Sequence, residues 1–159
     1  MNATQISIRL ATNAELYQVS VLLHDSFIEY RSLYTEEAFL ATTPDADQLA
    51  IRREEGPLWI AELGGAIVGT VSVVSRGEDL YIRGMGVLPT ARGNGWGDLL
   101  LQQVEDFGSG QKCKRLVLST TPFLFRAIRL YERFGFHRTD EGPHDLFGTL
   151  LFTMVKDLR

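Results

Sequence analysis

Cysteine is almost absent from this chain of 159 residues, which carries Cys113 alone. A single thiol can form no internal disulfide and cannot assemble a cysteine-based zinc site. The three histidines, at positions 24, 137 and 144, lack the close i, i+4 pairing of a helical metal site. We therefore predict that the protein has no metal site.

Long apolar runs are also missing. The longest, Ala66 to Val74, is interrupted by Gly69, Thr70 and Ser72, and it is far shorter than the ~18–20 residues that cross a bilayer. The N-terminal segment MNATQISIRLAT has no charged-then-apolar signal pattern. We therefore predict no membrane partner, and together with the lone thiol these absences favour the cytoplasm.

Positive charge is not in excess. The chain has 16 lysines and arginines against 20 aspartates and glutamates, a formal charge of −4, and it contains no basic stretch. Binding to a phosphate backbone is therefore not expected, so we predict no nucleic-acid partner. With 45% hydrophobic and 23% charged residues, the composition is that of a globular protein, and the length suits one domain over residues 1–159.

Hydrophobic periodicity predicts the first elements. Alternating apolar residues indicate a strand at 6–10, and Thr12-Asn13-Ala14-Glu15 resembles a capping box that opens a helix. A second helix is expected from a cap at Thr43-Pro44 up to Glu55, with an irregular aromatic stretch at 29–42 between the two helices.

The later segments complete an α/β pattern. We expect strands at 58–63, 66–74 and 80–87, a helix after Pro89, a strand at 115–119, a helix capped by Thr121-Pro122 and closed by Gly135, and strands at 136–140 and 149–156. The order β-α-α-β-β-β-α-β-α-β-β predicts one domain with a mixed, mainly antiparallel central sheet flanked by about four helices.

Glycines gather in one place. Five of them fall within 14 residues, at positions 84, 86, 93, 95 and 97, and the last three belong to the run RGNGWG that opens a helix. A helix N-terminus presents amides without intrahelical partners and attracts anions, and glycine lets the backbone approach a ligand closely. Arg92 adds a formal positive charge. The run is therefore a candidate phosphate site.

Three interpretations of the cluster compete. It can be a glycine-rich turn without a ligand. A dinucleotide site would need G-x-G-x-x-G in an early βαβ unit, whereas the spacing here is G-x-G-x-G after a meander. This second, nucleotide-binding interpretation is also disfavoured in its Walker form, because a Walker phosphate-binding loop would need a lysine that this run lacks.

The third interpretation is a resemblance to the GCN5-related N-acetyltransferases, the GNAT superfamily. Met85-Gly86-Val87 followed by Arg92, Gly95 and Gly97 resembles the acyl-coenzyme A signature of that family, [Q/R]-x-x-G-x-[G/A] after a strand. Downstream, the segment 127–136 resembles its second signature, A-x-x-L-Y-x-x-x-G-F, in the expected order. The resemblance covers essentially the whole chain, is weakest at 24–57, and implies a GNAT-like fold.

The resemblance also implies roles for individual residues. Acetyl-coenzyme A would be the cosubstrate, held along its pantetheine and pyrophosphate by backbone around Met85, Gly86, Val87, Arg92, Gly93, Asn94, Gly95, Trp96 and Gly97. Gly84 and Gly86 would suit a bulge that opens the sheet. Tyr131 would be the general acid that meets the departing sulfur, although its spacing also fits a core aromatic.

Two positions depart from the family pattern. Leu124 stands where the second signature usually carries an asparagine, whose hydrogen bond would be lost or replaced by Thr120 or Thr121. Tyr81 stands where many relatives carry a basic carboxylate. Asp79 shares the strand face of Tyr81, so we consider Asp79, or Glu78, as a catalytic base acting through water, with a plain water chain as the alternative.

The predicted function is therefore acyl-coenzyme A-dependent N-acyltransfer, with acetyl as the expected acyl group and an amine-bearing acceptor, by direct transfer in a ternary complex. A catalytically weak coenzyme A-binding or sensing module is the alternative, and an interaction domain without cofactor is a third. Candidate acceptor-pocket residues are Tyr30, Tyr34, Phe39 and the segment 144–147. Relatives commonly dimerise, so the resemblance also allows a homodimer.

Overall fold

The computed structural model describes residues 5–158, with strands β1 (Ile6–Leu10), β2 (Leu58–Leu63), β3 (Ala66–Arg76), β4 (Asp79–Val87), β5 (Arg115–Thr120), β6 (His137–Arg138), β7 (His144–Leu146) and β8 (Thr149–Asp157). Its α-helices are α1 (Leu16–Phe27), α2 (Glu36–Thr42), α3 (Ala46–Glu55), α4 (Trp96–Gly110) and α5 (Phe125–Phe134), and its 3-10 helices are η1 (Asn13–Glu15), η2 (Ile28–Leu33) and η3 (Pro89–Ala91).

The described residues leave out both chain ends. Residues 1–4 and 159, which belong to the predicted domain and in part to the segment inspected for a targeting signal, lie outside them. Within residues 5–158, every helix falls short of the length and apolar character that a membrane crossing requires.

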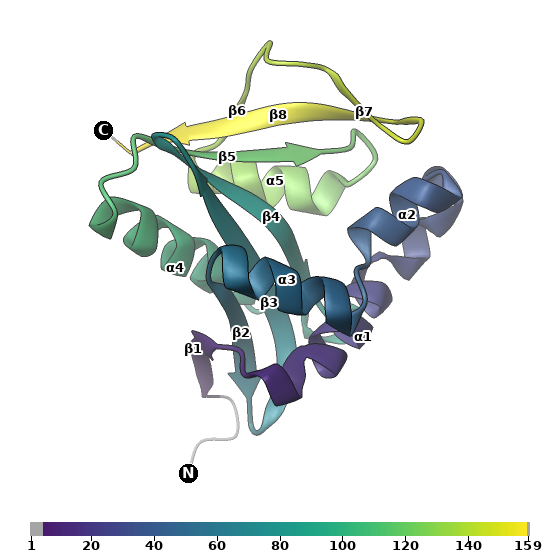
Figure 1. Cartoon of the computed structure of the whole chain (residues 1–159), viewed down its shortest axis with the longest axis vertical. Coiled ribbons are helices and arrows are strands. Elements are labelled where there is room, and N and C mark those ends of the chain that lie inside the picture. Colours follow the sequence, from purple (N-terminus) through teal and green to yellow (C-terminus); the bar gives the residue numbers. More distant parts are fainter. Residues whose placement is uncertain (1–4, 159) are drawn as a thin grey trace.

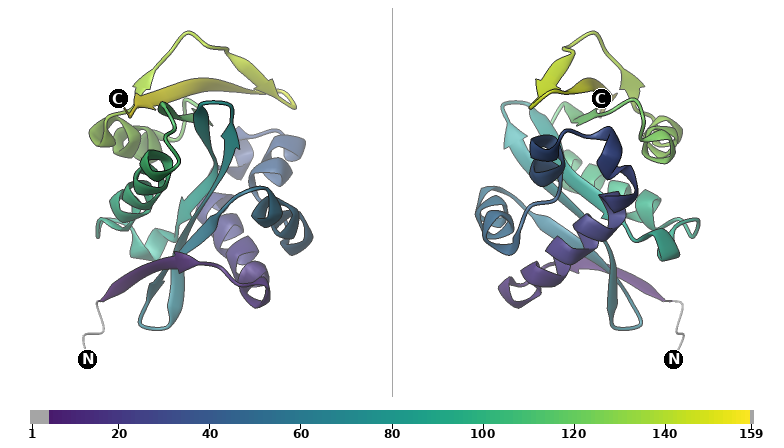
Figure 2. Two further views of the ribbon diagram at one scale, coloured as in Figure 1. Left: turned by 60° about the vertical axis from the view of Figure 1, so that its left-hand side comes forward. Right: turned by 90° about the vertical axis from the view of Figure 1, so that its right-hand side faces the viewer.

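One mixed sheet runs through the molecule in the order β1-β2-β3-β4-β5-β8-β6, with β7 added to β8 (Figure 1). The pair β4–β5 is parallel, and the other pairs are antiparallel. Helices α1, α2 and α3 lie on one face of the sheet, and α4 and α5 lie on the other (Figure 2). The predicted α/β fold with a mainly antiparallel sheet is confirmed.

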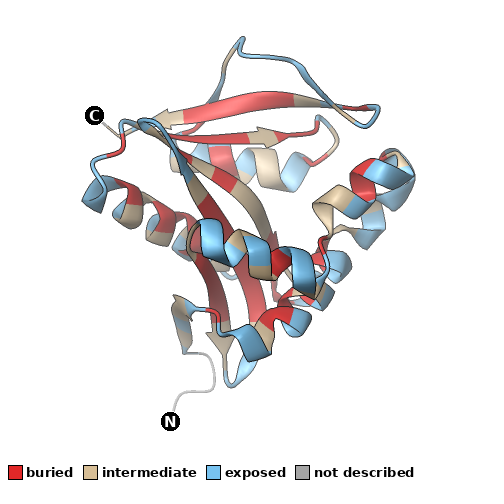
Figure 3. Cartoon of the chain, viewed as in Figure 1, coloured by how far each residue is buried: buried red, intermediate tan, exposed pale blue. Residues whose placement is uncertain are grey.

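Burial on both faces explains why the central strands are so apolar (Figure 3). In β2, Leu58 and Ile60 pack with Leu16, Val19 and Leu49 of α1 and α3. The alternate residues, Trp59 and Ala61, pack on the opposite face in the cluster that contains Leu100, Leu101 and Val104 of α4. Because successive side chains of a strand point to opposite faces, β2 must be apolar throughout.

Strands β4 and β5 pair over only part of their length. Their register runs from Asp79 opposite Arg115 to Ile82 opposite Leu118 and ends there. Beyond this point β4 continues to Val87 beside β3, whereas β5 continues to Thr120 beside β8. The sheet therefore opens between β4 and β5 toward their carboxyl ends.

A bulge in β4 begins at the same level. Ser72 of β3 lies opposite Gly84, and the next residue, Val73, lies opposite Ile82, so Arg83 is the extra residue. A bulge bends its strand and increases the local twist, which turns β4 away from β5. The bulge that we predicted at Gly84 and Gly86 thus occurs one residue earlier, at Arg83.

The helix count and two helix starts differ from the prediction. There are five α-helices in residues 5–158 rather than about four, because the stretch predicted to be irregular contains α2. This helix has only seven residues, is capped by the Thr35 hydroxyl, and buries Ala38 and Phe39. Its stability depends on tertiary packing, which a short pattern does not reveal.

Both predicted Thr-Pro caps are wrong. Helix α3 begins at Ala46, where Asp45 and Gln48 form a reciprocal capping box at 2.8 and 2.9 Å, because a carboxylate is available closer to the helix than Thr43. Helix α5 begins at Phe125, three residues after Pro122, since Leu124 is its N-cap. Gly135 does end α5 in the left-handed conformation, with φ of 112°.

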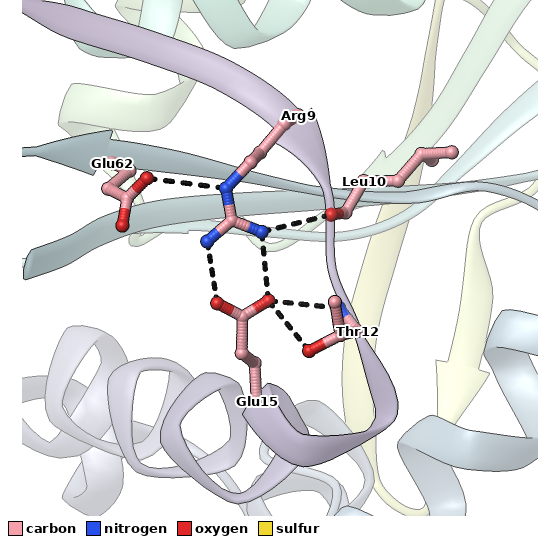
Figure 4. A network of polar contacts seen from close by, with 5 residues as sticks. All are labelled: Arg9, Leu10, Thr12, Glu15 and Glu62. Atoms are coloured by element: carbon pink, nitrogen blue, oxygen red, sulfur yellow. Dashed lines mark hydrogen bonds and ion pairs between the residues drawn. The ribbon is translucent and has the colours of Figure 1, made fainter. Parts of the chain in front are cut away.

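The predicted capping box at the first helix is present and extends into a network (Figure 4). The Glu15 carboxylate accepts the Thr12 backbone N–H at 2.9 Å and the Arg9 guanidinium at 2.6 and 3.0 Å. Arg9 also donates to Glu62 of β2 at 3.2 Å. Through the Arg9 and Thr12 bonds, the pKa of Glu15 falls from 4.5 to about 2, so this carboxylate ties the start of α1 to β1 and β2.

We expect Glu15→Ala to lower the free energy of unfolding by about 1 kcal/mol, because the substitution removes the helix cap. In the native protein the lowered pKa means that this stabilisation is complete above pH 4.5 and is lost as the pH falls toward 2. Urea unfolding at pH 7 and pH 3 measures both effects.

Glu54→Ala is the matched control, since Glu54 is exposed in α3 and makes no ion pair among the described residues. It should change the free energy of unfolding by less than about 0.5 kcal/mol. Equal losses in the two variants would contradict a structural role for the Glu15 network.

Candidate functional site

A cavity of about 430 Å³ lies beside the end of β4, between α1, the start of α4 and α5. Its lining includes nearly the whole predicted loop: Met85, Gly86, Val87, Arg92, Gly93, Gly95, Trp96 and Gly97. We call it the loop pocket. The other walls come from Ser26, Phe27 and Tyr30 on one side and from α5 on the other.

The loop pocket contains an uncapped helix N-terminus. Gly95, the N-cap of α4, has φ of 82° and offers no side chain to bond the first amides of the helix. Gly93 has φ of 83°, and the Asn94 side chain donates to the Ala91 carbonyl at 3.0 Å, which holds the turn. Free amides at the start of a long helix attract anions.

The side chains around this N-terminus are mainly cationic. Arg126, Arg129 and Arg133 line the pocket from α5, and Arg92 lines it from the loop, against a single acid, Asp98. Arg133 lies 3.5 Å from Asp98 and stays largely exposed. The pocket thus has a positive lining although the whole chain carries −4.

Arg92 holds the loop in place and also lines the loop pocket. Its guanidinium donates to Glu29 of η2 at 2.6 Å and to the Ser26 carbonyl of α1 at 3.0 Å. These bonds fasten the loop to the opposite wall. The three arginines of α5 are therefore the freer cations, and the sequence prediction did not include them.

Two glycines of the cluster make room for neighbouring helices. A Cβ on Gly86 would lie 3.0 Å from the Ser26 hydroxyl of α1, and a Cβ on Gly97 would lie 2.7 Å from Leu130 of α5. Around Gly93 and Gly95 nothing lies within 4 Å of such a Cβ. The open space over the helix start is thus formed by Gly93 and Gly95, whereas Gly86 and Gly97 allow α1 and α5 to close the pocket.

The Trp96 indole is a buried donor without a partner. Its Nε1 is fully buried and makes no hydrogen bond within the described part of the chain, although Trp96 lines the loop pocket. An unpaired buried N–H costs free energy, so this position favours an acceptor atom supplied by a ligand.

A second cavity, of about 280 Å³, lies where β4 and β5 part. It is lined from β4 by residues 81–85, from β5 by residues 118–120, and from the opposite side by Phe27, Tyr34, Arg52, Leu146 and Leu151. We call it the cleft pocket. Because the parallel strands diverge here, their side chains and backbone edges are available to a ligand.

The two pockets meet at a shared wall. Phe27, Met85, Leu124, Ala127 and Tyr131 line both of them. A group bound in either pocket therefore contacts the same residues, among them Met85 and Tyr131.

Tyr131 lies at this wall on the inner face of α5. Its side chain is 9% exposed and packs against Phe136, with ring centroids 5.8 Å apart. Burial raises the pKa of Tyr131 to about 12, and the nearby Tyr34 acts in the same direction. The phenol is therefore a protonated hydrogen-bond donor at any ordinary pH.

Leu124 is buried at the shared wall and offers no polar atom. Close to it, the Thr120 hydroxyl is buried, lines the cleft pocket and makes no hydrogen bond within residues 5–158. Thr121 also lines this pocket. These threonines thus lie where the sequence analysis expected a replacement for the missing asparagine.

Asp79 lies apart from both pockets, at the other end of β4. Its carboxylate accepts two hydrogen bonds from Arg115, at 2.8 and 3.2 Å, and Arg115 also binds Glu141. Six residues separate Asp79 from Met85, about 20 Å along an extended strand. The structure therefore does not bring Asp79 to Tyr131, and Glu78 lines the same remote depression as Asp79.

The predicted acceptor residues are divided among several positions. Tyr30 lines the loop pocket, and Tyr34 and Leu146 line the cleft pocket. Phe39 is buried in the cluster around Tyr34 instead, and His144, Asp145 and Phe147 line neither pocket. Within residues 5–158, no group of three or more His, Cys, Asp or Glu side chains is arranged to hold a metal ion.

Sequence reasoning missed five arginines of the two pockets, of which Arg52 and Arg83 line the cleft pocket. Arg126, Arg129 and Arg133 recur at i, i+3 and i+7, which puts them on one face of a helix and could have identified a cationic wall. Arg52 of α3 has no such signal, because its approach to β4 depends on the tertiary fold.

Comparison with known proteins identifies relatives. The family model described as "Acetyltransferase (GNAT) family" matches residues 19–136. The N-acetylaspartate synthetase of Xenopus tropicalis is 27% identical over 127 residues, which is 79% of this chain and 47% of that protein. An uncharacterized N-acetyltransferase of Escherichia coli is 29% identical over 114 residues, 68% of each chain. The chain thus spans less than half the length of the synthetase.

Solved structures share the fold. The PaiA N-acetyltransferase of Thermoplasma acidophilum, in complex with coenzyme A, superposes with a TM-score of 0.80 at 16% identity, covering 97% of this chain and 99% of that one. A protein of Salmonella typhimurium, solved with its cofactor acetyl-CoA, has a TM-score of 0.75 at 24% identity, covering 99% and 95%.

The burial of Tyr131 is testable by tyrosinate absorbance. Because the pKa of Tyr131 is about 12, the difference in absorbance at ~295 nm between the protein and its Tyr131→Phe variant should stay near zero up to about pH 11. A difference that rises with a midpoint near pH 10 would show that the phenol is solvated and would contradict the described wall.

Proposed function

The chain belongs to the GNAT acetyltransferase family, and we propose that its 159 residues act as one N-acetyltransferase domain that moves an acetyl group from acetyl-coenzyme A to an acceptor amine. The observation that carries this proposal is the meeting of two pockets at Met85 and Tyr131. Direct transfer needs two ligands whose reacting atoms touch, and pockets with one shared wall meet that need.

The loop pocket suits the donor. Free amides at the start of α4 and the arginines of α5 suit a pyrophosphate, which carries negative charge and many acceptor oxygens. The open space over Gly93 and Gly95 allows close approach to the backbone, and the unpaired Trp96 N–H would find an acceptor. The residues present therefore fit coenzyme A.

Each predicted residue then has a role. We assign the pyrophosphate to the backbone from Arg92 to Gly97, including Gly93, Asn94, Gly95 and Trp96. We assign the pantetheine and the thioester carbonyl to the β4 backbone at Met85, Gly86 and Val87, because this edge of β4 has no pairing with β5 and its backbone groups are available to a ligand.

Tyr131 acts on the leaving group. When bound, acetyl-coenzyme A supplies a thioester whose departing thiol has a pKa of ~8.5. Burial raises the pKa of Tyr131 to about 12, above the value of a free thiol, so complete proton transfer from the phenol to the thiolate is unfavourable. We therefore propose that Tyr131 donates a hydrogen bond to the developing thiolate, a charge-assisted bond in a buried site.

No Asp, Glu or His side chain lines the cleft pocket among the described residues. The acceptor therefore reacts as the neutral amine, with its proton lost to water before or during attack. We do not assign a base to Asp79, which lies beside Arg115.

The names of the relatives do not agree on one acceptor. N-acetylaspartate synthetase names an amino acid, whereas the fold is also that of a ribosomal-protein-S18-alanine N-acetyltransferase of Escherichia coli, with a TM-score of 0.76 at 15% identity. The proposal therefore covers the acetyl-coenzyme A donor and an acceptor amine.

We expect acetyl-coenzyme A to stabilise the fold by about 2.7 kcal/mol at a hundredfold excess over its dissociation constant. Gly95→Ala should weaken binding at least about tenfold, because φ of 82° strains any residue with a Cβ and distorts the amides at the start of α4. Thermal shift and calorimetry measure both quantities.

Gly65→Ala is the control for this strain. Gly65 has φ of 85° and, like Gly95, nothing within 4 Å of its Cβ position, but it lies in the turn between β2 and β3. It should cost similar stability and leave the coenzyme affinity unchanged. If the native protein shows no thermal shift with saturating acetyl-coenzyme A, the donor assignment is wrong.

A screen of amines with acetyl-coenzyme A, read by thiol release, tests transfer. For the best acceptor, Tyr131→Phe should lower kcat by about 10²-fold, as expected for losing one donor to a developing charge, while binding of coenzyme A is retained. Coenzyme A binding without turnover across the whole screen would instead support a binding or sensing module.

A further inference from the structure

The cleft pocket contains two guanidinium groups. Arg52 reaches it from α3, which lies over the sheet on the same side as α1, and Arg83 reaches it from the bulge of β4 (Figure 1). They are the only charged residues among those that line this pocket. Burial is the main cause that lowers the pKa of Arg52, and the positive charge of Arg83 is the second cause. The two guanidinium groups are therefore close to each other.

Arg83 is already paired. Its Nη1 contacts the Glu55 carboxylate at 2.5 Å, and its Nη2 donates to the Arg52 carbonyl at 3.2 Å. Its Nε is buried without a partner in the described part of the chain. Arg83 therefore connects the bulge of β4 to α3, and its Nε–H has no acceptor in the described part of the chain.

Arg52 has no such carboxylate. The only hydrogen bond of its guanidinium within residues 5–158 runs from Nη2 to the Ala41 carbonyl at 3.3 Å, and no acidic group there lies within 4.0 Å of that guanidinium. Two guanidiniums against the single carboxylate of Glu55 leave one positive charge in a half-buried position. A partly desolvated cation without a partner is costly, so this position favours an anion.

The location of Arg52 limits where that anion can sit. Its Nη1 lies 3.4 Å from the position of a Cβ on Gly84, and Gly84 directly precedes Met85 at the shared wall. Arg52, Met85 and Tyr131 line the same cavity of about 280 Å³, so a small molecule in it can place an anion at Arg52 and another group at Met85 and Tyr131. Gly84 is thus the residue whose missing side chain leaves this approach open.

We propose that the acceptor is a small amine that carries a carboxylate near its amino group, with Arg52 as the binding residue for that carboxylate. The inference rests on the proposed acetyl transfer. The cavity of about 280 Å³ suits an amino-acid-sized molecule. A guanidinium pairs with a carboxylate through charge-assisted hydrogen bonds, and the unpaired Thr120 hydroxyl offers a further contact in the same pocket.

Matched acceptor pairs test the proposal. Each amino acid is compared with its decarboxylated amine and with its carboxamide, which keep the side chain and the amine and remove the carboxylate charge. With the native protein we expect kcat/KM for the acid to exceed that for either compound without a carboxylate by about 10- to 100-fold. Compounds without a carboxylate that react as fast as the acids would overturn the proposal.

Arg52→Gln should reduce this preference to about one, because it removes the cation and keeps a polar side chain of similar reach. Arg52→Lys should keep part of the preference, which guards against a variant that simply folds poorly. Arg53→Gln is the control: Arg53 is the next residue of α3, is exposed, and donates to Asn13 outside the pocket. It should retain the native preference.

The outcomes separate this inference from the proposed function. A preference for acids that survives in Arg52→Gln overturns the role of Arg52 and leaves acetyl transfer standing. If no amine of either kind is acetylated, calorimetry of the same acids with the coenzyme A complex decides: binding that is lost in Arg52→Gln supports the carboxylate site, although transfer has failed. No binding of any acid overturns the site.

Discussion

The parting of β4 from β5 is the constraint on which the rest of the molecule depends. The two strands share only the register from Asp79–Arg115 to Ile82–Leu118, because each is then held by a different neighbour, β3 or β8. Backbone groups on the facing edges have no strand partner beyond that point, and buried backbone groups require partners. The parting thus creates both a space and a set of hydrogen-bonding groups that a ligand can satisfy.

The opening of the sheet, and not a need for backbone flexibility, explains the glycine cluster. Gly84 and Gly86 lie on the free part of β4 and let Arg52 and Ser26 approach it from the α1 face. Gly97 likewise lets Leu130 approach closely on the other face. Within the cluster, Gly93 and Gly95 are the two that have positive φ, and they form the turn that presents the start of α4. One composition feature therefore covers two physical roles, close packing and a special backbone conformation.

Local patterns predicted the parts of the fold and site that depend on neighbours in sequence. The strands other than β7, the start of α4 and the C-terminal stop at Gly135 follow from periodicity and turn chemistry over a few residues. Asp79 illustrates the limit: alternation fixes its strand face but not its partner, and Arg115 comes from a strand 36 positions away. Helix α2 and the position of Arg52 depend in the same way on tertiary packing, which no short pattern contains.

The charged side chains of the two pockets are arranged in the same way relative to the shared wall. Cationic side chains stand at the outer ends, on α5 for the loop pocket and on α3 for the cleft pocket, whereas Leu124, Ala127 and Phe27 make the shared wall apolar. An apolar wall excludes water, and this same exclusion holds the pKa of Tyr131 near 12 and strengthens any hydrogen bond that it donates. Anions bound at both ends would therefore fix two ligands by charge, with their reacting atoms beside the apolar wall. An acidic chain can carry such a site because the arrangement depends on the positions of the six arginines that line the two pockets and not on the net charge.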